Sequence, residues 1–236
     1  LRRPCVVAPT HAGSRHRLQP NEGMTLLRSG PSLVALAVAL VAACASEPAS
    51  QPPLPAPPPP FNELGRADAP VTIVEFSDLQ CHFCARYAIQ TFPQLRRDYI
   101  DTGKVRYVVH DLPLAYHANA VPAAIAARCA GEQGRYWEYR EALFREQHRL
   151  AQEPYGELAA GLGLDAERFA SCRNDPRPAA GIRADVNLAA SRGIDSTPSF
   201  VLNRSGADRD SDTIIEGAKP HAVFKSRIDA LLAPTN

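Results

Sequence analysis

Apolar residues in the second part of the chain form two patterns, short continuous runs and recurrences every three or four residues, which predict a mixture of strands and helices. Short β-branched runs over 71–76 and 104–109 predict two buried strands. Between them, apolar side chains recur every three or four residues over 84–99, which is typical of a helix. Pro93 lies inside this helical pattern and should kink it. Because a helix joins the two strands, we expect a βαβ unit with a parallel strand pair.

The stretch from about 111 to 196 predicts mainly helices, and it is too long to be a single crossover helix. We therefore expect a helical subdomain inserted between the strands. Its helices are predicted near 117–130, 136–147, 155–162, 165–173 and 178–192. The chain then returns to a strand at 199–203, a polar turn, a strand at 213–216 and a helix at 220–232. The order βαβ, helices, ββα predicts an α/β fold, a thioredoxin-like layout with a helical insertion.

The first 60 residues have the pattern of a leader and a linker. An apolar run over 33–43 is shorter than the about 20 residues that span a bilayer, and it has the size of a signal-peptide core. Met24 precedes this run and Arg28 supplies a positive charge, so we expect a signal peptide over 24–43. Residues 1–23 are then a wrongly assigned start or a disordered extension.

Cys44 follows Val41-Ala42-Ala43, a sequence that resembles a bacterial lipobox, where the cysteine is acylated after the leader is cut. Ordinary cleavage after Ala45 is the alternative and would discard Cys44. Residues 44–60 are so rich in proline that they favour extended polyproline II, which could reach roughly 40 Å. We expect a tether that holds a domain over 61–236 at the periplasmic face of a membrane, after export across the inner membrane. A ligand for a proline-recognition domain is the alternative.

Charge and cysteine content narrow the classes of function. The chain has 26 Lys and Arg against 25 Asp and Glu, and its basic residues form no stripe with aromatics, so we expect no nucleic-acid partner. Six cysteines are many for 236 residues. An oxidising compartment can use such a set both for structure and for catalysis.

Cys81 and Cys84 directly follow the first predicted strand and open the predicted helix. A Cys-x-x-Cys pair is also half of many zinc sites, but no second such pair and no closely spaced Cys/His pair follows here. We therefore interpret the pair as a redox dithiol, which needs neither a metal nor a cofactor. One helical turn brings the two sulfurs within disulfide distance. The helix N-terminus stabilises a thiolate at Cys81, which predicts Cys81 as the nucleophile and Cys84 as the resolving thiol.

Three residues around the pair are candidates for tuning it. His82, if protonated, would stabilise the Cys81 thiolate and make the protein a stronger oxidant; an exposed histidine of little effect is the alternative. Phe83 either offers an apolar contact to substrate or simply packs. Glu75 lies in the first strand, where a carboxylate needs a function or a partner. Near Cys84 it would move the proton of that thiol; on an exposed strand face it would have no such role.

Thr197-Pro198 precedes the strand at 199–203. In this order of elements we expect a cis peptide bond at Pro198, close to the dithiol. The backbone of Thr197 would then be free to pair with an extended substrate segment, as in strand addition.

The stretch from Val71 to Cys84, together with Thr197-Pro198 and the helical insertion, resembles the DsbA-like family of thioredoxin-fold disulfide oxidoreductases. It is most similar to exported and lipid-anchored bacterial members, and the similarity covers about 68–232. The resemblance implies dithiol exchange on exported thiol-containing proteins. It also implies that Glu75 is the buried acid and that Pro198 is the cis proline.

Two departures from the archetypal oxidase leave the direction of electron flow open. That oxidase has Pro and His between its cysteines, where this chain has His82 and Phe83. It also has Val before the cis proline, where this chain has Thr197, as isomerase-type relatives often do. A disulfide-donating oxidase, reoxidised by a quinone-linked membrane partner, is the first interpretation. A reductase or isomerase is the second.

Two further interpretations belong to other classes of protein. A Cu(I)-binding, metallochaperone-like protein could use the same thiols, but the one methionine lies in the leader and no Met-rich or His-rich tract supports it. A folding-assistance module would bind chains without using Cys81 at all.

Cys129 and Cys172 both fall in the helical subdomain, and we interpret them as a structural disulfide like those of some relatives. Two buried free thiols and a second redox relay are the alternatives. A bridge over this separation would stabilise the fold by about 4 kcal/mol in the chain-entropy model.

Overall fold

The computed structural model describes residues 60–234. The predicted start or extension over 1–23, the signal peptide over 24–43 and the lipidation site Cys44 lie outside these residues and stay predictions. All of the 44–60 tether except Pro60 also lies outside them. Between residues 60 and 234, no helix combines the length and the apolar character needed to cross a membrane.

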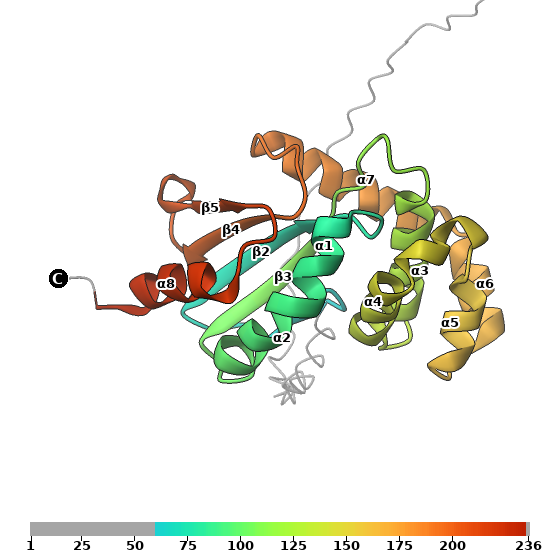
Figure 1. Cartoon of the computed structure of the whole chain (residues 1–236), viewed down its shortest axis with the longest axis horizontal. Helices are drawn as coiled ribbons and strands as arrows, with labels where there is room; N and C mark the ends of the chain where they lie inside the picture. Colours follow the sequence, from blue (N-terminus) through green and yellow to red (C-terminus); the bar gives the residue numbers. More distant parts are fainter. Residues whose placement is uncertain (1–59, 235–236) are drawn as a thin grey trace, which may run out of the picture. The chain divides into compact units, whose positions relative to one another are not determined.

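A five-stranded sheet in the order β1-β3-β2-β4-β5 carries the fold (Figure 1). β2 (Val71–Ser77) and β3 (Val105–Asp111) pair in parallel, so the βαβ prediction is confirmed. β4 (Ser199–Arg204) runs antiparallel to β2, and β5 (Thr213–Glu216) completes the predicted hairpin. β1 (Glu63–Leu64) adds a short antiparallel edge that the sequence did not predict, because two residues show no period.

The alternation of side chains along β2 separates two apolar layers. Val71 and Ile73 face one layer, where they pack with aromatic residues such as Phe92 and Phe224. Phe76 faces the other layer, which includes Ala189. Glu75 is two residues from Ile73 and therefore shares its face, beneath the helices that follow β2.

The helical connection from β2 to β3 is longer and less regular than predicted. It consists of α1 (His82–Arg86), the π-helical η1 (Tyr87–Thr91), α2 (Phe92–Leu95) and the π-helical η2 (Arg96–Ile100). The N–H of Phe92 bonds to the carbonyl of Tyr87, five residues back, directly before Pro93. Proline lacks an N–H and collides with the preceding turn of a regular helix, so the turn before Pro93 is widened at the place where we predicted a kink.

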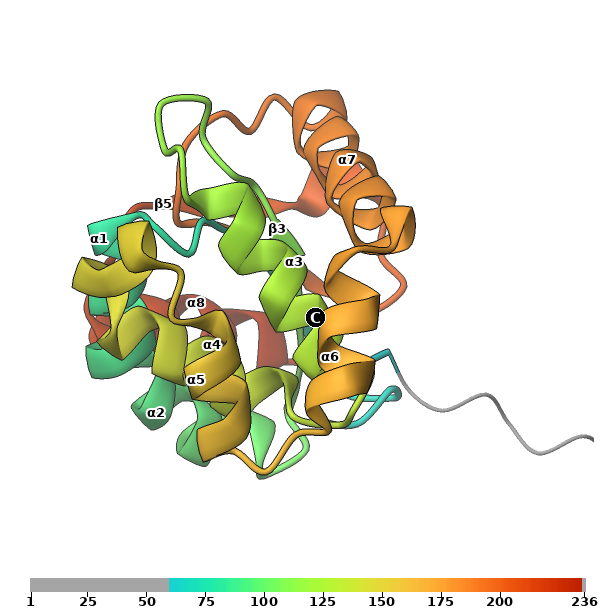
Figure 2. The same cartoon turned by 90° about the vertical axis from the view of Figure 1, so that its right-hand side faces the viewer.

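The predicted helical subdomain is present and contains every helix that the periodicity indicated (Figure 2). Its elements are α3 (Ala120–Gly131), α4 (Tyr136–Arg145), the 3-10 segment η3 (Gln147–Gln152), α5 (Tyr155–Gly161), α6 (Ala166–Arg173) and α7 (Pro176–Ser191). A further 3-10 turn, η4 (Arg209–Ser211), lies in the polar turn, and α8 (His221–Leu232) ends the fold. α7 begins two residues earlier than predicted, because Asp175 accepts the N–H of Arg177 and a proline fits the first turn.

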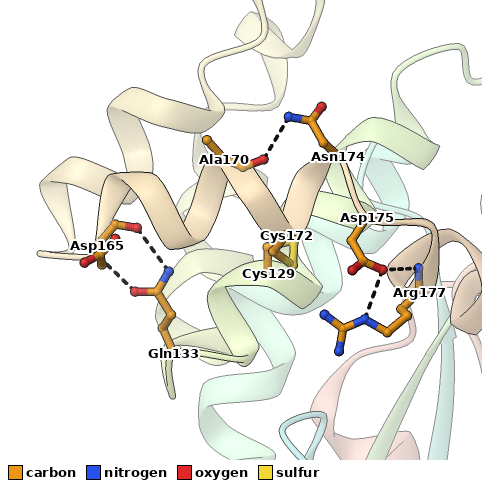
Figure 3. Close-up of a disulfide and its surroundings, with 8 residues drawn as sticks. All are labelled: Cys129, Gln133, Asp165, Ala170, Cys172, Asn174, Asp175 and Arg177. Atoms are coloured by element: carbon orange, nitrogen blue, oxygen red, sulfur yellow. Dashed lines mark hydrogen bonds and ion pairs between the residues drawn. A yellow bond between two sulfur atoms is a disulfide. The ribbon is translucent and has the colours of Figure 1, made fainter.

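Small side chains allow the helices of the subdomain to approach closely. The buried face of α3 is almost entirely alanine, and it packs with Tyr139, Leu143 and Phe169 of its neighbours. Cys129 of α3 and Cys172 of α6 form a disulfide with a Cα–Cα distance of 5.6 Å (Figure 3). In the same view, Gln133 exchanges two hydrogen bonds with the backbone of Asp165, so a second contact joins α3 to the start of α6.

A buried charge cluster joins the subdomain to the sheet. Arg128 of α3 donates to Asp111 at the end of β3 at 2.7 Å and also pairs with Asp185 of α7. Asp185 in turn contacts Nδ1 of His110 at 2.7 Å. A Cβ atom on Gly181 would lie 2.2 Å from Nη1 of Arg128, so glycine leaves the space that the guanidinium occupies. The cluster fixes how α3 and α7 sit on β3.

Replacing Cys129 and Cys172 by alanine should lower the free energy of unfolding by about 4 kcal/mol, because the bridge closes a long loop of the unfolded chain. Denaturant unfolding would measure this loss in a background where Cys81 and Cys84 are serine, so that only one disulfide differs. The same background with reductant added serves as the control. A loss under about 1 kcal/mol would contradict a stabilising role.

Candidate active site

The dithiol lies where β2 ends and α1 begins. Cys81 is the N-cap residue of α1, with an extended backbone, and Cys84 lies one turn into the helix. Both are free thiols, and both are buried. This is the arrangement that the strand–Cys-x-x-Cys–helix pattern predicted.

The surroundings of Cys81 favour its thiolate. The hydrogen bond from Cys84 lowers the pKa of Cys81 most, and Thr197 and the N–H groups of Cys84 and Phe83 add to this effect. Burial opposes them, and the resulting pKa is about 5. Sγ of Cys81 lies 3.5 Å from the carbonyl oxygen of Thr197. The buried hydroxyl of Thr197 has no hydrogen-bond partner within residues 60–234, so it is available to donate to the thiolate.

The surroundings of Cys84 favour its protonated thiol instead. Burial raises its pKa well above the usual value, the shared proton with Cys81 adds to this, and the charge of Glu75 raises it further. The N–H of Asp78 donates to Sγ of Cys84 at 3.5 Å and only partly offsets these effects. At neutral pH the pair therefore holds one thiolate, on Cys81, and one thiol, on Cys84.

Asp78 organises the turn between β2 and α1, a role that we did not predict. Its Oδ1 accepts the N–H groups of Gln80 at 2.7 Å and of Cys81 at 3.2 Å. Its Oδ2 accepts the N–H of Leu114 and contacts Nδ1 of His117, both at 2.8 Å. An aspartate that accepts the N–H two residues further on forms an Asx turn, a common turn signal, so the sequence did contain a hint of this role.

Gln147, in the subdomain, reaches the same turn. Its Nε2 donates to the carbonyl of Leu79 at 2.8 Å and to that of Cys81 at 3.0 Å. Gln80 bonds back to the subdomain by accepting the N–H of Asn119. The turn that carries the nucleophile is thus held from the subdomain side as well as from the sheet. No local sequence pattern predicts this contact, because the partners are more than sixty residues apart.

Glu75 is fully buried, so the alternative of an exposed strand face is wrong. Its Oε2 accepts the hydroxyl of Tyr107 at 2.7 Å, and its Oε1 accepts Nη2 of Arg140 at 2.6 Å. The same Nη2 donates to Oγ of Ser77 at 3.0 Å. The carboxylate that the sequence singled out therefore has a buried cation as its partner, supplied by α4.

The peptide bond between Thr197 and Pro198 is cis, as expected from the order of the elements. The carbonyl of Pro198 accepts the N–H of Gly217 at 2.7 Å, which ties this turn to the end of β5. The turn brings Thr197 against Cys81, although 116 residues separate them in the chain.

Two exposed aromatic side chains, Phe83 and Tyr116, lie near the turn that carries the dithiol. Phe83 is 41% exposed and lies against His82, with ring centroids 3.9 Å apart. The guanidinium of Arg86 lies over the Phe83 ring, 4.9 Å from its centroid. Tyr116, 77% exposed, packs edge-on against His117. The groups that lower the pKa of Cys81 most are Cys84, Thr197 and the helix N–H groups, so tuning by His82 stays a prediction.

Metal binding has no preformed position in the part of the chain that the structure describes. No three His, Cys, Asp or Glu side chains there converge as metal ligands would.

Comparison with known proteins places this site in a family. A family model described as thioredoxin matches residues 61–216. The crystal structure of alpha-DsbA1 from Wolbachia pipientis is 28% identical, with a TM-score of 0.64. The match covers 72% of this chain and 89% of that one.

Two curated relatives are longer than the matched region. A Rickettsia prowazekii protein, provisionally named a protein-disulfide oxidoreductase, is 31% identical over 146 residues, which are 59% of this chain and 53% of that protein. The Na⁺/H⁺ antiporter NhaA 3 of Salinispora tropica is 38% identical over 140 residues, again 59% of this chain. This chain spans 21% of the length of the antiporter.

Alkylation of the reduced protein by iodoacetamide should follow a single titration with a midpoint at about pH 5, the pKa of Cys81. The Cys84→Ala substitution should move the midpoint to higher pH, because it removes the largest stabilising contact. Cys84→Ser keeps a hydroxyl donor and is the matched control, with a smaller shift.

The pH dependence of the free energy of unfolding is a second measure of the lowered pKa of Cys81. The pKa of Cys81 is lower in the folded protein than the value of about 8.5 for an unfolded chain. The reduced protein should therefore gain stability relative to Cys81→Ser as pH rises from about 5 to about 8.5, and lose it as pH falls through 5. A difference that does not vary with pH would contradict the assignment.

Proposed function

The chain belongs to the thioredoxin family, among its DsbA-like members, and on that basis we propose that it is a thiol–disulfide oxidoreductase that donates the Cys81–Cys84 disulfide to exported proteins. The observation that carries the proposal is the asymmetry of the two thiols. A thiolate on Cys81 with a pKa of about 5 stabilises the reduced protein. A dithiol whose reduced form is stabilised gives up its disulfide readily, as an oxidase must.

The reaction follows from this asymmetry. A substrate thiolate attacks Sγ of Cys81 in the oxidised protein, the Cys81–Cys84 bond breaks, and Cys84 leaves and takes up a proton. A second thiolate of the substrate then attacks the substrate sulfur of the mixed disulfide. Cys81 leaves as the stabilised thiolate. The substrate has lost two electrons and the protein has gained them, so a membrane partner linked to quinone would have to reoxidise the pair.

The entrance to the site fits an unfolded polypeptide. Thr197 lies beside Cys81 with its backbone carbonyl at 3.5 Å, where an extended segment can pair with the cis-proline turn. Phe83 offers an exposed apolar surface next to the nucleophile. Glu75 beneath Cys84 is suited to exchange a proton with the resolving thiol.

A reductase or isomerase is the second candidate, and Thr197 is the observation that favours it. A hydroxyl at this position can stabilise a thiolate, but it also distinguishes this chain from the archetypal oxidase, which has valine there. The two candidates use the same residues and differ in the redox state in which the protein is held.

The proposed location is the periplasmic face of a membrane. The apolar run over 33–43 supports export, and Cys44 in its lipobox-like context supports a lipid anchor followed by the proline-rich tether. Such a tether would allow the domain to reach exported proteins while it remains near its membrane partner.

Mixing the oxidised protein with reduced, unfolded ribonuclease A should restore ribonuclease activity, because the Cys81–Cys84 disulfide is transferred. Cys81→Ser should abolish the transfer, and Arg145→Met, which changes an exposed side chain of α4, serves as a folded control. Scrambled ribonuclease separates the candidates, since an isomerase in its reduced form reactivates it and an oxidase does not. Full activity of Cys81→Ser would indicate a binding module and overturn the proposal.

Direct alkylation of cells, without prior reduction, should find Cys81 and Cys84 protected as a disulfide. An oxidase must be oxidised to act, whereas a reductase must be held as a dithiol. Mass spectrometry of the alkylated protein measures both thiols, with the Cys129–Cys172 bridge as an internal standard. A reduced pair beside an intact bridge would rule out the oxidase and leave the reductase or isomerase.

A further inference from the structure

A buried network of charged and phenolic groups lies beneath the dithiol. Glu75 accepts hydrogen bonds from Arg140 and Tyr107, and the hydroxyl of Tyr107 contacts that of Tyr87 at 3.0 Å. Tyr87 lies one turn after Cys84 in the same helical run. Burial, and then the charge of Glu75, raise the pKa of Tyr107 and Tyr87, so both hydroxyls remain protonated. The network thus connects the helix of the resolving thiol to the Glu75–Arg140 pair.

Arg140 enters this network from the helical subdomain. It is 3% exposed, and its guanidinium lies 4.8 Å from the Phe144 ring centroid and 5.9 Å from that of Trp137. Removing two charges from water costs about as much as their attraction returns, so burial of this pair does not by itself stabilise the fold. If Arg140 were absent, a lone carboxylate in this position would be driven to take up a proton.

A groove connects Arg140 to the surface. It has a volume of about 340 Å³ and runs between the helices after β2 and α4, with Arg140, Trp137, Phe92 and Ala88 in its lining. It is large enough for several water molecules, which can reach the guanidinium end of the network. The groove thus brings solvent to a side chain that is one hydrogen bond away from Glu75.

We propose that Arg140 is a positioning residue that holds Glu75 in the ionised form, so that Glu75 can accept the proton of Cys84 when the active-site disulfide closes. This inference rests on the proposed oxidoreductase function and adds one requirement to it. A base has to be unprotonated before it can accept a proton, and in this buried position the subdomain supplies the charge that keeps it so.

The step concerned is the closing half of reoxidation. The Cys81 thiolate attacks a disulfide of the oxidant and forms a mixed disulfide, and one thiolate of the oxidant leaves. Cys84 then gives its proton to Glu75, Sγ of Cys84 bonds to Sγ of Cys81, and the bond from Cys81 to the oxidant breaks. The second half of the oxidant leaves as a thiolate. Two electrons pass from the protein to the oxidant, and the Glu75 proton passes to water.

The experiment follows this step with oxidised glutathione. The reduced full chain is mixed with it, quenched with acid at intervals, and analysed by mass spectrometry for the glutathione mixed disulfide and the closed Cys81–Cys84 form. In Arg140→Met, closure at neutral pH should slow by about 10²-fold, the usual size of a general-base contribution, and the mixed disulfide should accumulate. Raising the pH should restore the rate, because Glu75 then ionises without its partner.

The control variants separate charge from packing. Arg140→Lys retains a cation and should close at nearly the wild-type rate with the wild-type pH profile. Arg140→Gln retains a hydrogen-bond donor without the charge and provides the same test if Arg140→Met does not fold. Arg145→Met removes an exposed arginine of the same helix and should change nothing. Glu75→Gln should be slow at every pH.

A spectroscopic readout follows the proton itself. The infrared difference spectrum between Arg140→Met and the Arg140→Met/Glu75→Gln double variant should contain a protonated carboxyl band at neutral pH. The corresponding difference between the wild type and Glu75→Gln should not contain it.

Each outcome decides the inference. A wild-type rate and pH profile in Arg140→Met, or in Arg140→Gln where methionine prevents folding, would overturn it. Equal slowing in Arg140→Lys without recovery at high pH would mean that Arg140 only supports the fold. Rapid closure in Glu75→Gln would also overturn it, while leaving the oxidoreductase intact. Cys81→Ser that still oxidises ribonuclease would instead overturn the proposed function, so the two failures are distinguishable.

Discussion

Carboxylates buried at the subdomain side of the sheet are the constraint on which the structure depends. Glu75 and Asp111 lie on adjacent parallel strands, and a buried carboxylate is tolerated only when it is paired and hydrogen-bonded. The helical subdomain supplies the partners, Arg140 for Glu75 and Arg128 for Asp111. The strands thus carry two buried carboxylates whose cationic partners come from outside the sheet. The docking of the subdomain follows from this requirement as well as from apolar packing.

The same constraint shapes the active site, because the dithiol lies between the two parts. Asp78 is a third buried carboxylate. Its Oδ1 accepts hydrogen bonds from the turn that carries Cys81. Its Oδ2 contacts His117 from the segment that leads into the subdomain. The nucleophile is therefore positioned by a turn that both parts hold. The resolving thiol sits above Glu75. Burial, then Cys81, and finally the charge of Glu75 raise the pKa of Cys84 and keep its proton in place until disulfide closure.

Much of this could be predicted from local pattern. The β-branched run over 71–76 and the helical period after it placed Cys81 at a strand-to-helix junction, where the helix N-terminus stabilises a thiolate. Glu75 was singled out because a carboxylate within an apolar strand needs a partner. Arg140 carried a similar signal, since it shares the apolar face of α4 with Tyr136 and Phe144. Sequence spacing could not predict that Arg140 is the partner of Glu75, because they lie 65 residues apart.

By itself, the sequence determined the elements, the order in which they occur and the chemistry of the Cys-x-x-Cys pair, because these depend on neighbours within one or two turns of chain. Tertiary structure decided the contacts that give the site its properties. Thr197 meets Cys81 across 116 residues, and Arg140 meets Glu75 across 65. A helix or strand preference is a local property of the backbone, whereas the ionisation of a buried group depends on what the fold brings against it. For that reason the dithiol and the separate roles of its two thiols could be predicted from the sequence, but the distant groups that set the pKa of each thiol were visible only in the fold.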